Sequence, residues 1–337
     1  MSEPRAAETR EPLVTLAQVL GQDAAVTILR QAVERRALHH ALLFVGPEGV
    51  GKRTTAIALA AELFCLQPQA GACGRCAACV QVAARSHADL RTVGFFFDDK
   101  KKELREHTLI EQVREAQLFL AGRAFGGGPK VVVFEEAHAL TEDAQNAALK
   151  MLEEPPRGSL LVLVCHNASR LLPTVRSRCQ RVSFVPLAPA VIESVLRDRF
   201  DTAADDARFL SQHSDGSLAF AADPAALRAA HAGALELIGA ARSRSYAAVV
   251  SAVRDTFGST RGVPLELEMV LSVLRRHLRA AAGLGRAELT PGAKTGTLVG
   301  ALRAAEAAYA AVVDLGRNAN RSLTAERMAL RIGASLE

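Results

Sequence analysis

The sequence predicts an α/β domain built on a parallel sheet, followed by a region made almost entirely of helices. In the first half of the chain, short apolar runs alternate with amphipathic helical patterns, which is typical of strands and helices layered around a parallel sheet. After Pro186 nearly every segment has helical periodicity, interrupted by turn-forming stretches such as 214–217, 257–264 and 290–296. The change at Pro186 predicts a domain boundary there.

Four apolar runs are the predicted strands: 41–45 (ALLFV), 130–134 (KVVVF), 160–164 (LLVLV) and 180–185 (QRVSFV). A helix is expected from Lys52 to Cys65, directly after the first strand and a glycine-rich loop. A second helix is expected over 141–154, because Thr141 can cap its first turn, two acidic residues follow, and a Pro-Pro pair stops it.

Bulk composition indicates a cytoplasmic protein of two or three domains. The chain has 337 residues with 49% hydrophobic content, enough for a large core, and a formal net charge of +5, which makes polyanionic partners plausible. The N-terminal stretch MSEPRAAETREP lacks the apolar core of an export signal, and the apolar runs are too short to span a bilayer. Cysteines are therefore expected to be reduced.

The stretch GPEGVGKRTT (46–55) resembles a phosphate-binding loop between a strand and a helix. Gly46, Gly51 and Lys52 match the pattern, Gly49 lies inside it, and backbone N–H groups would point at an anion. The position that should offer a hydroxyl to Mg²⁺ is Arg53, and Thr54 comes only afterwards. The loop either binds nucleotide or is an empty inherited loop; ATP hydrolysis is not expected.

Acidic and amide side chains follow two other predicted strands. In P-loop ATPases the strand corresponding to 130–134 is usually followed by an Asp that helps to hold Mg²⁺ and a Glu that orients water. Here Glu135 takes the position of the Asp and Glu136 follows it, so the two metal-side positions that differ from the pattern are Arg53 and Glu135, which predicts that the Mg²⁺ site is lost. Asn167 follows the strand at 160–164, where ligands of open α/β sheets gather.

Four cysteines, Cys65, Cys73, Cys76 and Cys79, lie within fifteen residues. Reduced cysteines at this spacing are hard to explain as core packing, and four thiolates complete a tetrahedral Zn²⁺ site with no position left for chemistry. The sequence thus predicts a structural zinc module over 65–79. Cys165, on a predicted strand, is expected to be a small buried apolar residue.

A basic segment follows the third strand, with Arg176, Arg178 and Arg181 close together in LLPTVRSRCQ. Composition alone favours a solvated basic loop. However, the chain resembles the AAA+ clamp-loader family of bacterial DNA replication in several stretches. These are this basic segment, GQ at 21–22, HHALLFVGPEGVGKRT, the four-cysteine insert and ALKMLEEPP. The match covers about residues 13–185 with specific motifs, and the rest of the chain more loosely.

The resemblance implies three domains: an AAA+-like domain with the zinc module (1–186), a small helical lid (187–235) and an all-α collar (236–337). It also implies a heteropentamer with gamma/tau-type and delta-type subunits, which loads a sliding clamp onto primer-template DNA. Ser177-Arg178-Cys179 corresponds to the family's SRC motif, whose Arg reaches a neighbouring subunit's ATP site. Some members do not hydrolyse ATP, which fits Arg53.

Two alternatives remain. The first is the ATP-hydrolysing gamma/tau-type motor subunit. Arg53 and Glu135 argue against it, and so does the segment GSLAFA, which has Ala219 at a position where the resemblance implies an Arg in motor subunits. The second is a free-standing zinc and nucleic-acid binding module. Weak net charge and the scarcity of aromatic residues argue against it, because base stacking needs aromatic platforms.

Overall fold

The computed structural model describes residues 13–68, 71–94, 96–98, 103–105, 109–219, 223–243, 245–257, 265–283, 297–315 and 319–336. The strands are β1 Ala41–Val45, β2 Leu90–Val93, β3 Phe96–Asp98, β4 Glu103–Arg105, β5 Lys130–Phe134, β6 Ser159–Cys165 and β7 Gln180–Ser183. The helices up to residue 200 are η1 Leu16–Gln18, α1 Asp23–Glu34, α2 Lys52–Phe64, α3 Ala77–Ala83, α4 Ile110–Ala121, η2 Ala137–Ala139, α5 Glu142–Glu153, η3 Ala168–Arg170, α6 Pro173–Arg176 and α7 Pro189–Phe200. Later helices are α8 Ala204–His213, α9 Pro224–Arg242, α10 Tyr246–Phe257, α11 Leu265–Ala281, α12 Leu298–Leu315 and α13 Arg321–Ser335.

The chain divides into two compact units. The first comprises Met1–Val191 with Gly216–Ala219, and the second comprises Ile192–Asp215 with Phe220–Glu337. The first division falls after Val191, a few residues beyond Pro186. Residues 216–219 belong to the first unit although they are surrounded in sequence by the second.

A five-stranded parallel sheet forms the centre of the first unit, in the order β2-β5-β6-β1-β7. Val45 at the end of β1 is level with Cys165 of β6 and Ser183 of β7, so the strands finish at one edge. Because β1 lies between β6 on one side and β7 on the other, the loop after β1 leaves the sheet where ligands of open α/β sheets usually bind. A short antiparallel pair, β3 and β4, lies outside this sheet.

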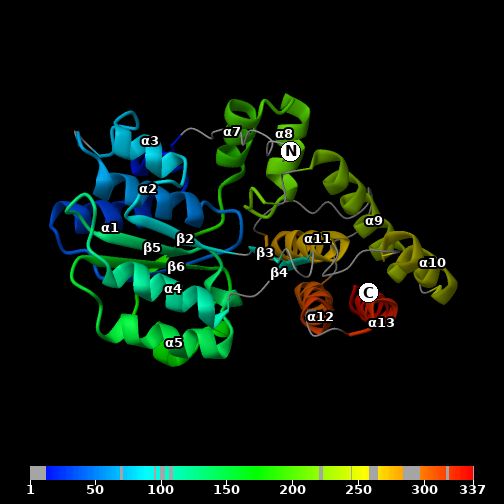
Figure 1. Ribbon diagram of the computed structural model, residues 1–337. Coiled ribbons are helices and arrows are strands. Elements are labelled where there is room, and N and C mark those ends of the chain that lie inside the picture. The colour runs from blue at the N-terminus through cyan, green and yellow to red at the C-terminus, as the bar shows by residue number, and fades with distance from the viewer. Residues whose placement is uncertain are drawn as a thin grey trace, which may run out of the picture. The chain divides into compact units, whose positions relative to one another are not determined.

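Helices cover both faces of the sheet: α2 lies on one side, and α4 and α5 on the other (Figure 1). The core cluster beneath α4 and α5 includes Leu43, Phe134 and Leu163 from the strands, with Val113 and Met151 from the helices. Strands buried on both faces read as continuous apolar runs instead of alternating ones, which is why they could be located in the sequence.

The predicted strands are confirmed at 41–45 and 130–134; the other two occupy 159–165 and 180–183. The helix expected from Lys52 is α2, and the one expected over 141–154 is α5, whose Thr141 side chain accepts the N–H of Ala144 as a cap. Strand β2 and helix α4 had not been predicted. Together these elements confirm the α/β fold with a parallel sheet.

In the described residues of the second unit, every regular element is a helix, as expected. Helix α9 packs against α10, α11 and α13, and α12 packs against α11 and α13. The boundary between a lid and a collar at residue 235 stays a prediction; α9 runs through that position. Across the described ranges of the chain, the structure contains no helix with the length and apolar character needed to cross a membrane.

Candidate functional site

The phosphate loop joins β1 to α2 and has the backbone shape that its glycines predict. Gly49 and Gly51 have φ angles of 68° and 93°, in the left-handed region that favours glycine. At Gly46, a Cβ atom would lie 2.5 Å from the carbonyl oxygen of Phe184, so no side chain fits there. Gly51 is the N-cap residue of α2, so the free N–H groups of the helix begin at the loop.

Lys52 is buried and its ammonium is bound by the loop itself. Nζ donates to the carbonyl oxygen of Gly46 at 2.8 Å and also to that of Pro47. Burial lowers the pKa of Lys52, while the carboxylate of Glu136 opposes that shift. A phosphate bound in this loop would have to draw the ammonium away from two carbonyl groups.

Residues 216–219 lie directly against the phosphate loop. The N–H of Leu218 donates to the carbonyl oxygen of Gly49 at 3.0 Å. A Cβ atom on Gly49 would be 2.4 Å from both the hydroxyl of Ser217 and the backbone nitrogen of Ala219. Ala219 therefore lies next to the loop, and its methyl group offers no charge to a phosphate.

The two metal-side positions form an ion pair with each other. Nε of Arg53 lies 2.9 Å from Oε1 of Glu135, and Nη1 of Arg85 lies 2.5 Å from the same oxygen. The Glu135 side chain is only 14% exposed, so both guanidinium groups act on a largely buried carboxylate. Arg85 was missed in the sequence, because it lies in a turn fifty residues before its partner and belongs to no motif.

Two other predicted nucleotide ligands, Thr54 and Asn167, are exposed. Oδ1 of Asn167 accepts hydrogen bonds from the N–H and hydroxyl groups of Ser169, which caps η3. The next threonine, Thr55, is buried, and its hydroxyl donates to the Gly51 carbonyl at 2.8 Å. A role of Thr54 or Asn167 in nucleotide binding stays a prediction.

Glu136 has surroundings quite different from those of Glu135. Burial raises its pKa, and the nearby carboxylate of Glu48 acts in the same direction. Its carboxylate lies 3.4 Å from Nδ1 of His138 and 3.8 Å from Nδ1 of His166. Neither histidine was selected from the sequence, although His138 lies two residues after Glu136 in EEAH.

The four predicted cysteines come together. Cys65 directly follows α2, Cys76 is the N-cap residue of α3, and Cys79 is buried in the first turn of that helix. The sulfur atoms of all four lie within 4.8 Å of one another. In a tetrahedral site with metal–sulfur bonds of about 2.3 Å, neighbouring sulfurs are about 3.8 Å apart, so the cluster could hold a metal ion after a small contraction.

Backbone donors favour the thiolate form that a metal requires. The N–H of Cys73 lies 3.3 Å from the sulfur of Cys65, and that of Cys76 lies 3.4 Å from the sulfur of Cys73. Burial acts to raise the pKa of Cys76, but hydrogen bonds from the backbone at Cys79 and Leu66 bring it down to about 6.

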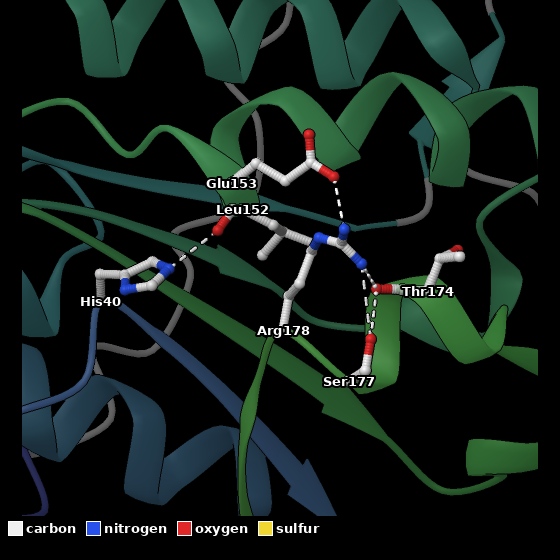
Figure 2. A network of polar contacts seen from close by, with 6 residues as sticks. All are labelled: His40, Leu152, Glu153, Thr174, Ser177 and Arg178. Atoms are coloured by element: carbon white, nitrogen blue, oxygen red, sulfur yellow. Dashed lines mark hydrogen bonds and ion pairs between the residues drawn. The ribbon is translucent and has the colours of Figure 1, made fainter.

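Arg178 lies between α6 and β7, beside the end of α5 (Figure 2). Its guanidinium is 2.7 Å from a carboxylate oxygen of Glu153 and donates to the carbonyl oxygen of Thr174 at 3.0 Å. The Arg178 side chain is 37% exposed and that of Glu153 is 48% exposed. Because exposed ion pairs of this kind contribute only about 0–1 kcal/mol, Glu153 orients the guanidinium without fixing it.

A cavity of about 450 Å³ opens beside this arginine, on the edge of the sheet formed by β7. It is lined by His39, His40, Leu152, Glu153, Ser177, Arg178, Cys179 and Gln180. His40 is fixed on the other side of the cavity by a hydrogen bond between Nε2 and the Leu152 carbonyl (Figure 2). The guanidinium of Arg178 is therefore partly exposed and lies beside an open cavity.

Residues 21–188 match the family described as DNA polymerase III, delta subunit. Through this segment, the chain belongs to that family. The delta' subunit of DNA polymerase III from Pseudomonas aeruginosa is 42% identical over 185 residues, which are 54% of this chain and 55% of that protein. The delta' subunit of Bacillus subtilis is 33% identical over 190 residues, 56% and 55% of the two chains.

A gamma/tau subunit from Mycobacterium tuberculosis is also similar, with 32% identity over 187 residues, 54% of this chain and 30% of that protein. The chain thus spans about half the length of the delta' relatives that it matches. The phosphate loop, the cysteine cluster and Arg178 all lie within the segment that matches the DNA polymerase III delta family.

Proposed function

We propose that this chain is a delta'-type subunit of a bacterial clamp loader, a stator that does not hydrolyse ATP. The observation that carries the proposal is the ion pair of 2.9 Å between Arg53 and Glu135. Mg²⁺ at a P-loop is normally held by the loop hydroxyl and by an acidic residue after the neighbouring strand. Here a guanidinium replaces the hydroxyl and occupies the carboxylate, so the ion would meet a positive charge instead of oxygen ligands.

The surroundings of the loop support the same proposal. Ala219 lies against Gly49, at a position where the resemblance to motor subunits would require an arginine. Lys52 and the backbone donors could still hold a phosphate, so nucleotide binding without turnover is compatible with this site. Gly46, Gly49, Gly51, Lys52, Thr54, Glu135, Glu136 and Asn167 would then form a degenerate nucleotide site.

We further propose that Arg178 acts in trans. In a heteropentamer with gamma/tau-type and delta-type subunits, its guanidinium would leave Glu153 and reach the γ-phosphate of ATP bound to a neighbour. Residues 187–235 would form the lid, and 236–337 the collar that assembles the ring. The complex would act in the cytoplasm and load a sliding clamp onto primer-template DNA.

The cysteine cluster is proposed to hold a structural Zn²⁺ ion. Four sulfur ligands suit zinc in a closed tetrahedral site, which offers no open position for a substrate. Because Cys65 follows α2 and Cys76 begins α3, the ion would tie the two helices together.

The test is a titration of the purified chain with ATP, with and without Mg²⁺, combined with an ATPase assay. We expect any ATP affinity to be independent of Mg²⁺ and turnover to be absent. Turnover at about 1 s⁻¹ or faster, in the range of working enzymes, would refute the proposal and favour a gamma/tau-type motor subunit.

A further inference from the structure

Glu136, His138 and His166 form a second group of potential metal ligands, separate from the cysteines. Glu136 lies between β5 and η2, His138 lies in η2, and His166 directly follows β6. One ligand atom from each residue lies within 4.8 Å of the other two. The group is assembled by the sheet, because β5 and β6 are neighbours and end at the same edge.

The distances within this group are close to those of a filled metal site. Oε2 of Glu136 is 3.4 Å from Nδ1 of His138 and 3.8 Å from Nδ1 of His166. Bonds of about 2.0–2.1 Å to a tetrahedral ion place neighbouring ligand atoms about 3.3 Å apart. Two edges of the tetrahedron are thus nearly formed, and along the third edge the ligand atoms of the two histidines lie within 4.8 Å of each other.

The simpler explanation, a core histidine satisfied by hydrogen bonds, does not account for His138. Its side chain is only 7% exposed, and its Nδ1 atom has no hydrogen-bond partner among the described residues. An unpaired buried polar atom is unfavourable, because it has lost its hydrogen bonds to water. The Nδ1 atom faces Glu136, and the His138 and His166 rings lie close together, with centroids 3.6 Å apart and planes tilted by 52°.

Charge at this place permits a cation. A histidine binds a metal ion through its neutral imidazole, so the surrounding charges decide whether the site can accept a cation. The cations of Lys52 and Arg170 are nearby and oppose a further positive charge. The carboxylates of Glu136 and Glu48 face the same region and offset them.

We propose that Glu136, His138 and His166 bind a second divalent ion of the zinc type, with a coordination position left open. Two imidazoles and one carboxylate favour Zn²⁺ and similar first-row ions over Mg²⁺, which prefers oxygen ligands. Three protein ligands leave the fourth position for water or a phosphate oxygen, as in open zinc sites. At this edge of the sheet, a site for a zinc-type ion would then be present in place of the Mg²⁺ site of P-loop ATPases.

The experiment measures zinc bound to the full-length chain after dialysis against low-micromolar Zn²⁺ with excess Mg²⁺. We expect about two zinc ions per chain, and about one after His166→Ala or Glu136→Gln. The ion that remains in these variants should be the one bound by the cysteines, and this ion should be lost in Cys76→Ser. His39→Asn serves as a control, because the His39 ring also lies against a second histidine ring, that of His40, but belongs to neither group of ligands.

Cobalt identifies the ligands independently. Co²⁺ in the cysteine site gives intense sulfur-to-metal absorption, whereas a second Co²⁺ bound by two imidazoles and a carboxylate should add only weaker bands, absent in His166→Ala. Circular dichroism establishes that the variants are folded. One zinc ion per unmodified chain, or a second ion retained in both His166→Ala and Glu136→Gln, would overturn the proposal.

Discussion

The two ends of α2 differ in how their sites are built. At the C-terminal end, four thiols from fifteen consecutive residues gather within 4.8 Å, and all of them are of the type that a closed metal site requires. At the N-terminal end, the site draws on residues from 46 to 219, and its positions for Mg²⁺ have been replaced by a guanidinium and a longer acid.

One helix thus has a complete set of potential metal ligands at one end, while the residues expected to hold Mg²⁺ at its other end have been replaced. The backbone of the phosphate loop is intact, with Gly49 and Gly51 in left-handed conformations. Its side chains, however, satisfy one another: Lys52 binds the loop carbonyls, and Arg53 binds Glu135. The loop keeps its backbone shape while its side chains are paired with one another, whereas the four cysteines offer ligands that could hold a metal ion.

The largest expected effect is at the cysteine end. Cys76→Ser should remove about one zinc ion per chain and lower the melting temperature of the first unit, because structural zinc contributes about 10–16 kcal/mol in zinc-finger peptides at neutral pH. Metal analysis and thermal unfolding measure both effects. Cys165→Ala is the control, since Cys165 is buried on β6 outside the cluster. Unchanged zinc content in Cys76→Ser would contradict the assignment.

The next effect concerns Arg178, and it tests whether this domain acts on ATP through the arginine at its edge and not through its own phosphate loop. Arg178→Ala should leave the chain folded, since the pair with Glu153 is half-exposed and worth little. In the reconstituted complex, it should slow clamp-stimulated ATP hydrolysis and clamp loading. Arginine fingers of GTPases contribute about 10³–10⁵ in rate, which is the upper limit here.

Two further variants distinguish a finger from a surface charge. Arg178→Lys should restore little, because an ammonium lacks the planar fork that binds two phosphate oxygens. Arg176→Ala removes a nearby exposed arginine and should behave as the unmodified chain. If the complex with Arg178→Ala hydrolyses ATP at the unmodified rate, Arg178 has no catalytic role.

The sequence predicted the locally determined parts of this molecule well. The buried strands at 41–45 and 130–134 were found with their observed bounds, because both faces are apolar and each run ends in turn-forming residues. The cysteine cluster was found because its ligands are close in sequence. The loop glycines were found because their positions depend on backbone conformation.

The partners of the acidic residues could not be predicted in the same way. Glu135 is bound by Arg85, and Glu136 faces His166, a residue thirty positions later, just after another strand. Such pairs depend on the order of strands in the sheet, which no single segment specifies. His138 is the exception: its proximity to Glu136 could have been predicted from the sequence, since it lies only two residues after Glu136.

The smallest expected effect is at the N-terminal end of α2, where Arg53→Ser combined with Glu135→Asp should restore Mg²⁺ ligands. Serine supplies the missing hydroxyl and removes the cation that lies 2.9 Å from the carboxylate. We expect Mg²⁺ then to increase ATP affinity by about tenfold, or about 1.4 kcal/mol, in a calorimetric titration. In the unmodified chain, Mg²⁺ should have no effect.

Turnover should nevertheless remain absent in this double variant, because Ala219 beside Gly49 still offers no cation to the γ-phosphate. Arg53→Ser alone is the matched control: Glu135 stays paired with Arg85 at 2.5 Å, so its carboxylate is less available and a smaller gain is expected. An ATP affinity insensitive to Mg²⁺ in the double variant would mean that the Mg²⁺ ligands are not restored, and no detectable ATP binding would mean that the loop does not receive nucleotide at all. The difference between the two ends of α2 would then be one between a binding site and an empty loop.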